Sequence, residues 1–406
     1  MHHVIIGASA AGLTAAKTIR DQKPSDSITV ISKDAHIYSR CMLHMVLSGK
    51  KPIEGINFMP KDFFEVNNIV WRGGETVSRV EAEKNLLHME SGEQLSYDTL
   101  LIATGSAYFV PPIQGFREAK NVFGLRDYSD VEQLNTVIAT GKRCVIIGSG
   151  LVGLDAASAL CTRGVSCSVV ELADRMSPLQ LDATAAAAYQ TRFEAAGCAF
   201  YLSEKAAGSE LDSDGNITAV LLESGVRIPC DFVLVSAGVR PSFGLLAGSG
   251  VETDRAVKVN AFLCANVPNI WAAGDVAGIS GIWPNAMSQG EVAAYNMCGI
   301  PTEYVDKAGV KNILSFYGLT TISLGTNAPA EGDEVVVQQT EKSYKRVVLR
   351  DNVVTHVILQ GDISNNDFWQ ALVTTKLPVG KLGKSVFELT SADFSKYEPK
   401  QGVLEL

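Results

Sequence analysis

The sequence predicts an α/β protein with two doubly wound, Rossmann-like, three-layer dinucleotide-binding domains and a C-terminal α+β domain built on an antiparallel sheet. Three observations predict it. A strand, glycine turn and helix near the start, HHVIIGASAAGLTAAKTI, return 141 residues later as RCVIIGSGLVGLDAASAL. Each copy precedes a second apolar strand, SITVISKD or VSCSVVEL. From about residue 311, runs such as DEVVVQQT and YKRVVLRDNVVTHVILQG alternate like antiparallel strands, and DFWQALVTTK predicts a final helix.

Composition narrows the class of protein. The chain has 406 residues, of which 46% are hydrophobic and 19% charged, so it is long and apolar enough for several folded domains. A net charge of −9 without any Lys/Arg run longer than two argues against nucleic-acid binding. No apolar stretch reaches the ~20 residues of a membrane span, and the N-terminus shows no basic leader. We expect a cytoplasmic protein that binds neither nucleic acid nor membrane.

The two glycine turns predict two dinucleotide sites. A glycine turn that opens a helix points backbone N–H groups and the positive end of the helix dipole at a pyrophosphate. In the first turn Gly7 permits the tight turn, Gly12 permits close helix–strand packing, and Ser9 replaces the usual middle glycine. The second turn, from Gly148 through Gly150 to Gly153, has the full GxGxxG pattern. One copy could merely permit packing, but two copies in the same context favour ligand binding.

Acidic residues at strand ends predict the sugar contacts. Glu171 ends the second strand of the second unit, where a carboxylate accepts both ribose hydroxyls and repels a 2′-phosphate, which favours NAD(H). A solvated strand-end charge is the alternative. The first unit has Ser32, Lys33 and Asp34 at the same place, with Asp34 as the candidate ribose ligand. Two dinucleotide sites imply two dinucleotides, of which one is usually a tightly held flavin and the other an exchangeable nicotinamide. Asp275, after Gly274, would face the ribityl hydroxyls of the flavin or serve as a helix N-cap.

The order of GASAAG, ATG, GSGLVG with its glutamate, AGVRP, AAGD and NAMSQG resembles the FAD-dependent pyridine nucleotide–disulfide oxidoreductases. Within that superfamily, YSRCMLHMVLSG and SFYGLTTISLG look closest to NADH:rubredoxin reductases, nitrite reductase flavin domains, single-cysteine coenzyme A-disulfide reductases and NADH oxidases. The resemblance implies a split FAD domain over 1–112 and 242–310, an NAD domain over 113–241, and an interface domain over 311–406.

The resemblance also implies the cofactor-binding residues. The expected FAD contacts, together with the strand-end positions named above, are Gly7, Ser9, Ala10, Gly12, Arg40, Val77, Ala103, Thr104, Gly105 and Asp275. The loop expected near the isoalloxazine edge is Trp283, Pro284 and Asn285. The expected NAD contacts are Gly148, Gly150, Val152, Gly153, Glu171 and Gly238.

Cys41 is the candidate catalytic residue, and its role stays open. The disulfide-reducing relatives carry a CxxxxC pair that this sequence lacks, whereas coenzyme A-disulfide reductases and NADH oxidases resemble it in having a single cysteine nearly here. Packing beside the flavin is the alternative. His44, three residues later, could protonate a product or the thiolate, or form part of the site wall. The eight cysteines are not spaced like metal ligands, so we expect no metal.

These observations predict an NADH-dependent flavoprotein oxidoreductase that passes hydride between NADH and FAD. Single electrons would then pass between FAD and a separate carrier, which could be rubredoxin, ferredoxin or an iron–sulfur subunit. The chain could act as a homodimer or as the NAD-reactive subunit of a larger complex such as a 2-oxoacid oxidoreductase. Two alternatives remain: a single-cysteine NADH oxidase, peroxidase or coenzyme A-disulfide reductase using Cys41, and a flavin-bound assembly or redox-sensor protein.

Overall fold

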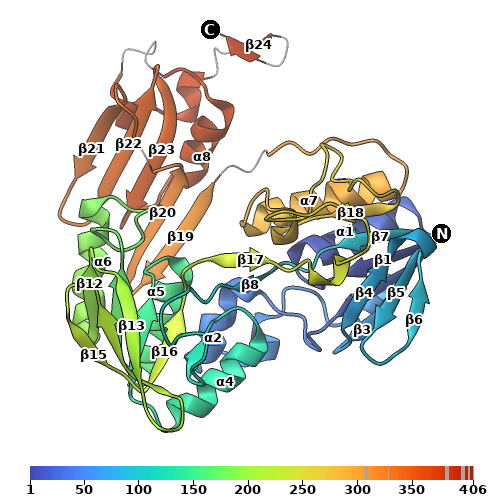
Figure 1. Cartoon of the computed structure of the whole chain (residues 1–406). Coiled ribbons are helices and arrows are strands. Elements are labelled where there is room, and N and C mark those ends of the chain that lie inside the picture. Colours follow the sequence, from blue (N-terminus) through green and yellow to red (C-terminus); the bar gives the residue numbers. More distant parts are fainter. Residues whose placement is uncertain (307–309, 328, 380–383, 395–397, 401–402, 406) are drawn as a thin grey trace. The chain divides into compact units, whose positions relative to one another are not determined.

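A computed structural model of the chain describes residues 1–306, 310–327, 329–379, 384–394, 398–400 and 403–405 (Figure 1). Its contacts divide it into two compact units. Unit 1 comprises residues 1–142, 211–217 and 231–306, and unit 2 comprises residues 143–210, 218–230 and 307–406. Each unit contains one of the two glycine turns. The finer division into three domains remains a prediction.

A five-stranded parallel sheet forms the centre of unit 1, in the order β18-β7-β1-β2-β3. Because β1 lies between β2 and β7, the chain winds outward in both directions from it, as a doubly wound sheet requires. The strands are β1 (His2–Ile6), β2 (Ser27–Ser32), β3 (Val70–Gly73), β7 (Thr99–Ile102) and β18 (Ile270–Ala272).

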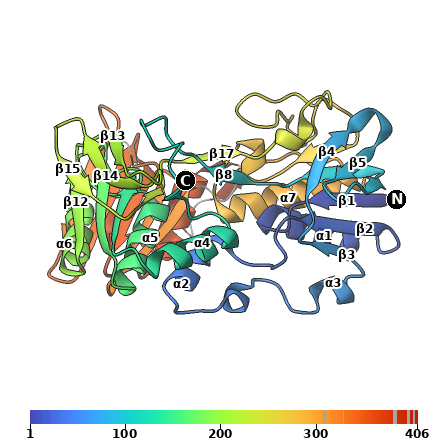
Figure 2. The ribbon, with the colours of Figure 1, turned by 60° about the horizontal axis from the view of Figure 1, so that its bottom comes forward.

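Alternating side chains give this sheet two buried faces. Ile5 and Leu101 pack on one side against helices α1 (Ala10–Gln22) and α7 (Trp283–Met297), which lie beside each other in Figures 1 and 2. Val4 packs on the other side. There the sheet meets the antiparallel strands β4 (Val77–Glu81), β5 (Leu86–Met89) and β6 (Gln94–Ser96).

The remaining segments of unit 1 are short. Strands β8 and β17 pair antiparallel, and β9 and β16 pair parallel. Helix α4 begins after Asp127, whose side chain forms a reciprocal capping box with Asp130. The bounds are α2 (Leu43–Leu47), α3 (Phe63–Val66), α4 (Tyr128–Ile138), β8 (Ser106–Tyr108), β9 (Val122–Phe123), β16 (Phe232–Val235) and β17 (Val239–Pro241).

Unit 2 contains the second parallel core. Strands β10, β11 and β12 pair in parallel, with helix α5 between β10 and β11 in the chain and α6 between β11 and β12. Strands β13, β14 and β15 form a separate sheet. The bounds are β10 (Arg143–Ile147), α5 (Leu151–Thr162), β11 (Ser166–Glu171), α6 (Ala183–Ala195), β12 (Cys198–Leu202), β13 (Ala206–Leu211), β14 (Ile217–Leu222) and β15 (Arg227–Pro229).

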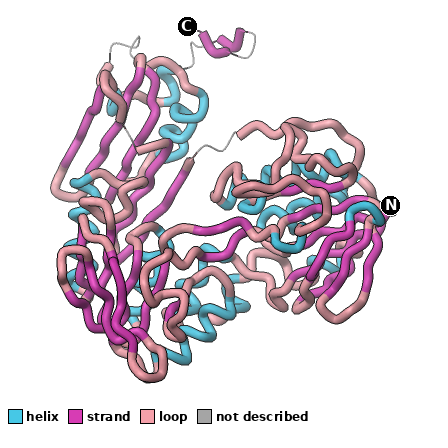
Figure 3. The backbone as a smooth tube through the Cα atoms, viewed as in Figure 1, coloured by secondary structure: helices cyan, strands magenta, loops and turns pink. Residues whose placement is uncertain are grey.

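An antiparallel sheet with the order β19-β20-β23-β22-β21 completes unit 2 (Figure 3). Helix α8, at the predicted position, buries Trp369 and Leu372 against it. Val335 and Val337 of the edge strand β21 are exposed. The bounds are β19 (Lys311–Phe316), β20 (Leu319–Gly325), β21 (Glu334–Gln339), β22 (Tyr344–Arg350), β23 (Val353–Gln360), α8 (Asn366–Thr375), β24 (Glu398–Lys400) and β25 (Val403–Glu405).

A buried polar network connects this sheet with the start of α6. Arg346 donates to the side-chain oxygen of Asn327 at 2.9 Å and lies 3.5 Å from the carboxylate of Asp182, the N-cap of α6. His356 is fully buried, with Ser323 3.2 Å from its Nε2 and Arg346 3.3 Å from its Nδ1. Burial, and then the Arg346 charge, lower the pKa of His356 to about 3.

None of the helices in the part of the chain that the structure describes combines the length and the apolar character needed to cross a bilayer.

Candidate functional site

A cavity of about 630 Å³ opens where the parallel strands of unit 1 end. Residues that follow four strands line it: Gly7 after β1, Asp34 after β2, Thr104 after β7 and Asp275 after β18. The carboxyl ends of parallel strands meet at one edge of a sheet, and this edge is where doubly wound folds bind ligands. The volume lies in the range of small-molecule sites.

The first glycine turn makes a close backbone cradle beside the cavity. Gly7 has φ +116°, and a Cβ there would lie 2.1 Å from the carbonyl oxygen of Ala103. A Cβ on Gly12 would lie 1.9 Å from the carbonyl oxygen of Gly7. Both glycines are therefore required by space. They let α1 start directly at the cavity, where its first residues, Ala10 and Ala11, are part of the lining.

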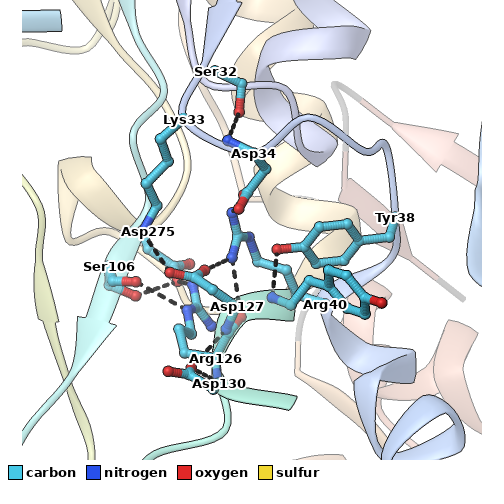
Figure 4. A network of polar contacts seen from close by, with 11 residues as sticks. Ser32, Lys33, Asp34, Tyr38, Arg40, Ser106, Arg126, Asp127, Asp130 and Asp275 are labelled. Carbon is cyan, nitrogen blue, oxygen red and sulfur yellow. Dashed lines mark hydrogen bonds and ion pairs between the residues drawn. The ribbon is translucent and has the colours of Figure 1, made fainter. Parts of the chain in front are cut away.

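Basic and acidic side chains of the cavity lining form one network of ion pairs (Figure 4). Arg40 forms ion pairs with Asp34 at 2.7 Å and with Asp127, and Lys33 reaches the other oxygen of Asp127 at 2.5 Å. The sequence predicts Lys33, Asp34 and Arg40 as binding residues but misses Asp127. The available signal was the helix-start pattern in RDYSD, with acidic residues at the N-cap and three positions later.

Asp275 is held by Ser106 and Arg126, two residues that no sequence motif predicts. It accepts hydrogen bonds from the Ser106 hydroxyl at 2.8 Å and from Arg126 at 2.5 Å (Figure 4). Arg126 also donates to the Ser106 carbonyl at 3.0 Å, and its own backbone N–H donates to Asp130 at 2.7 Å. Burial raises the pKa of Asp130. These contacts fix the Asp275 carboxylate at the cavity wall.

Most of the predicted FAD residues meet at this one cavity. The lining includes Gly7, Ser9, Ala10, Ser32, Lys33, Asp34, Arg40, Val77, Ala103, Thr104, Gly105, Gly274, Asp275 and Trp283. Three others, Gly12, Pro284 and Asn285, are not among the lining residues. The prediction of a loop at 283–285 is wrong, because these residues form the first turn of α7, where Pro284 is favoured. Asn285 is buried in α7, donates to Ser280 at 3.0 Å and Asp306 at 3.1 Å, and its Oδ1 has no partner in the described part of the chain.

Cys41 lines the same cavity and is exposed. It lies in the 3-10 turn Arg40–Met42, immediately before α2. His44 is half-buried in α2, and its ring hydrogen-bonds the backbone of Cys41. Burial lowers the pKa of His44, so at neutral pH the imidazole is uncharged. The structure therefore puts a thiol at the cavity without assigning it chemistry.

The second glycine turn lies in unit 2, between β10 and α5. Gly148 has φ +100°, and Gly150 is the N-cap of α5. Glu171, at the end of β11, accepts hydrogen bonds from the backbone and hydroxyl of Ser149 at 2.8 and 2.7 Å and from the backbone of Ala173 at 3.0 Å. The carboxylate is thus oriented beside the turn, and its binding of a ribose stays a prediction.

The other predicted NAD residues are placed by their elements. Gly153 is buried in α5, whereas Val152 is 44% exposed. Gly238, in unit 1, has φ +101° and comes directly before β17. Their role as nucleotide contacts stays a prediction.

Comparison with known proteins identifies the relatives. The family described as pyridine nucleotide-disulphide oxidoreductase matches residues 1–290. A nitrite reductase [NAD(P)H] of Bacillus subtilis is 31% identical over 94% of this chain, which spans only 48% of that protein. The epsilon subunit of an NADH-dependent phenylglyoxylate dehydrogenase of Aromatoleum evansii is 31% identical over 92% of this chain and 90% of its own length.

A solved structure, a covalent complex of putidaredoxin reductase with putidaredoxin, has a TM-score of 0.80 and 25% identity, covering 93% of this chain and 94% of that chain. This likeness confirms the predicted fold class.

Proposed function

This chain belongs to the pyridine nucleotide-disulphide oxidoreductase family, and on that premise we propose that it carries electrons between NADH and a separate iron–sulfur or rubredoxin-type protein. The family and the structural neighbours are FAD- and NAD(H)-binding oxidoreductases, and the chain is an NADH-dependent flavoprotein enzyme. We place it in the cytoplasm, as the NAD-reactive subunit of a larger complex that oxidises a 2-oxo acid or forms one.

The observation that carries the proposal is the cavity of unit 1, whose lining fits FAD. The close backbone contacts that only glycine allows at Gly7 and Gly12 let α1 begin at the cavity, where its N-terminal N–H groups would receive a pyrophosphate. Bound FAD supplies the chemistry that exchanges a hydride with NADH and single electrons with a carrier. The chain would supply Arg40 and Lys33 to neutralise phosphate charge, and Asp275 to accept hydrogen bonds from the ribityl chain.

In the same proposal unit 2 binds the nicotinamide dinucleotide. The turn from Gly148 to Gly153 would hold its pyrophosphate at the N-terminus of α5, and Glu171 would accept the ribose hydroxyls. What the protein contributes to hydride transfer is alignment of the two cofactors and exclusion of water.

The relatives support the choice of acceptor. The phenylglyoxylate dehydrogenase subunit matches over nearly its whole length, and its name makes it one subunit of an enzyme for a 2-oxo acid. The solved complex pairs a reductase of this fold with putidaredoxin. A carrier protein is therefore the acceptor that we propose, and its identity is the first question for experiment.

The decisive experiment is anaerobic purification of the untagged protein from its native host, followed by identification of the subunits that elute with it. We expect iron–sulfur subunits, and we expect NADH to bleach the flavin rapidly with many turnovers to an added ferredoxin or rubredoxin. A chain that elutes alone and whose flavin NADH does not reduce would contradict the proposal and favour the assembly or sensor alternative.

Thiol chemistry at Cys41 is the second candidate, because this exposed thiol lines the cavity. The variant Cys41→Ser separates the two. Under our proposal it retains at least half of the NADH-to-carrier rate, because electrons leave through a protein and need no thiol. The thiol mechanism would be established instead by two results together. Cys41→Ser would lose tenfold or more of the NADH-to-carrier rate, and the wild type, but not the variant, would reduce coenzyme A disulfide or peroxide.

A further inference from the structure

Asp127 binds two cations of the cavity lining at once. Its Oδ1 accepts a hydrogen bond from Nη1 of Arg40, and its Oδ2 accepts one from Nζ of Lys33 at 2.5 Å. All three residues line the cavity of unit 1 (Figure 4). One carboxylate therefore holds together two positive charges that would otherwise repel each other.

Arg40 is held from several directions. Its Nη2 lies 2.7 Å from a carboxylate oxygen of Asp34. Its Nη1 donates to the carbonyl oxygen of Arg126 at 3.0 Å as well as to Asp127. Its guanidinium carbon lies 5.4 Å from the centre of the Tyr38 ring, which is a cation–π contact. A guanidinium has five N–H donors, and these hydrogen bonds use three, so within the described part of the chain two remain for an anion.

Lys33 depends on Asp127 for its position. It comes directly after β2, and its side chain is 59% exposed. A lysine side chain at such a position has many rotamers, so ordering it for a ligand costs conformational entropy. The ion pair with Asp127 orders the side chain in advance, so less entropy is lost when an anion binds.

Asp127 is itself firmly placed. It is the N-cap of α4, and its side chain and that of Asp130 form a reciprocal capping box. The backbone N–H of Asp127 donates to the Asp130 carboxylate at 2.8 Å. The hydroxyl of the buried Tyr38 accepts a hydrogen bond from the backbone N–H of Tyr128, the first residue of α4, at 3.0 Å. The Asp127 carboxylate is therefore fixed, and the positive end of the helix dipole favours its charge.

Helix capping alone does not explain a carboxylate here. An N-cap needs a side-chain oxygen, which Asn or Ser supplies as well as Asp does. The negative charge is what binds Arg40 and Lys33. Partly exposed ion pairs contribute little to folding stability, so the charge is better explained by where it places the two cations.

We propose that Asp127 is a positioning residue that holds Arg40 and Lys33 for the diphosphate of FAD. This inference rests on the proposed function, in which these two cations neutralise phosphate charge. Asp127 would not contact the phosphates. Both of its oxygens face cations, so its own repulsion of a phosphate is largely cancelled, and its effect is to keep the two cations converged before the ligand arrives.

The test titrates FAD into the full-length apoprotein, followed by flavin fluorescence, with two variants that separate charge from capping. Asp127→Asn keeps the cap and loses the charge, whereas Asp127→Glu keeps the charge and caps less well. We expect the Kd for FAD to rise about tenfold in Asp127→Asn and less than about threefold in Asp127→Glu. The urea unfolding midpoint of the apoprotein should equal the wild-type value in Asp127→Asn and be lower in Asp127→Glu.

Two further variants complete the comparison. Asp127→Ser also caps the helix, so it should repeat the result of Asp127→Asn and replaces that variant if it fails to fold. Asp62→Asn is the matched control, because Asp62 is the N-cap of α3 and does not line the cavity. It should bind FAD as the wild type does.

The order of the affinities decides. The positioning role is overturned if Asp127→Asn binds FAD as tightly as the wild type, or if Asp127→Glu binds no more tightly than Asp127→Asn. A lower unfolding midpoint in Asp127→Asn would also overturn it, since the carboxylate would then serve the fold. A wild-type apoprotein that binds no FAD would instead contradict the proposed function itself.

Discussion

Glu171 is the residue on which nucleotide selection should depend. Its carboxylate is held by Ser149 and Ala173 at the end of β11, so its negative charge has a fixed position. We expect Glu171→Arg to lower the preference for NADH over NADPH by about tenfold or more, because a 2′-phosphate would meet a cation instead of an anion. Steady-state kcat/KM for both nucleotides measures this. The charge-matched control is Glu223→Arg, because Glu223 is exposed in the turn between β14 and β15.

Asp275 should determine how tightly FAD binds. In Asp275→Asn the shape is kept, but Arg126 loses its ion pair and the ribityl chain loses a charged acceptor. We expect FAD affinity to fall by about 10- to 100-fold, roughly 1.4 to 2.7 kcal/mol. Titrating apoprotein with FAD and following flavin fluorescence measures it. Asp62→Asn, at the start of α3, should bind FAD as the wild type does, and equal affinity in both variants would contradict the assignment.

The sequence could predict the residues whose position follows from a local pattern. Gly7, Asp275 and Glu171 each end a strand in a recognisable turn, and the structure places the first two at the cavity. Arg126 and Ser106 could not be found this way, because they lie 149 and 169 residues before Asp275 in the chain. Contacts of that kind depend on tertiary packing and leave no local signal.

At the scale of elements, the crossing of α1 and α7 has an unusual consequence for a glycine substitution. A Cβ on Gly290 would lie 2.1 Å from the carbonyl oxygen of Ala11. Gly→Ala inside a helix normally stabilises by about 1 kcal/mol, but here it must push the helices apart. We expect Gly290→Ala to lower the unfolding midpoint in urea. Met287→Ala, exposed on the same helix, should leave it nearly unchanged, and a stabilised Gly290→Ala would refute the close crossing.

The buried histidine of the C-terminal sheet should make unit 2 acid-sensitive. The folded-state pKa of His356 is about 3, below its value of 6.5 in the unfolded chain, so between these values only the unfolded state takes up the proton. Stability contributed by the neutral imidazole is therefore present above pH 6.5 and is lost as pH falls. We expect about 2 kcal/mol less stability at pH 5 from this group. The loss should be absent in His356→Gln, and urea unfolding of both proteins at pH 7 and pH 5 measures it. An equal fall in the free energy of unfolding from pH 7 to pH 5 in both proteins would exclude a contribution of His356.

Element prediction succeeded where long apolar runs are bounded by turn residues. Helix α8 and the hairpin of β22 and β23 lie where the sequence indicates. The strands β4, β5 and β6 escaped notice because only some of their side chains are buried, so their apolar pattern is short and broken. The buried side chains of β4 and β5 pack against the parallel sheet of unit 1. The strands of that sheet lie elsewhere in the chain, so the local sequence of β4 to β6 does not show this burial.

At the scale of the molecule, the two units should respond differently to loss of FAD. All residues that line the cavity belong to unit 1, so ligand binding should stabilise that unit by mass action. We expect removal of FAD to raise hydrogen exchange at least several-fold in β1, α1 and β18. The C-terminal sheet of unit 2 should change little, which serves as the internal control. Uniform loss of protection in both units would show that they unfold together.

The predicted boundaries and the observed units differ in kind. The motifs predict a split FAD domain, an NAD domain and a C-terminal domain, whereas the folded chain forms two compact units. A motif shows where a ligand-binding turn lies. It does not show how much surface two segments bury against each other, and that buried surface decides which segments form one compact unit. Limited proteolysis that releases residues 311–406 intact would support the threefold division.

The edge strand β21 has a practical consequence for concentrated solutions. Among the described residues no strand pairs with its outer side, and Val335 and Val337 are 45% and 49% exposed. Such an edge is a template for strand-to-strand association between molecules. Precipitation on concentration would then start here and not at the cofactor cavity. Val337→Lys should delay turbidity at high protein concentration while leaving flavin content unchanged, which makes it a useful first variant for crystallisation.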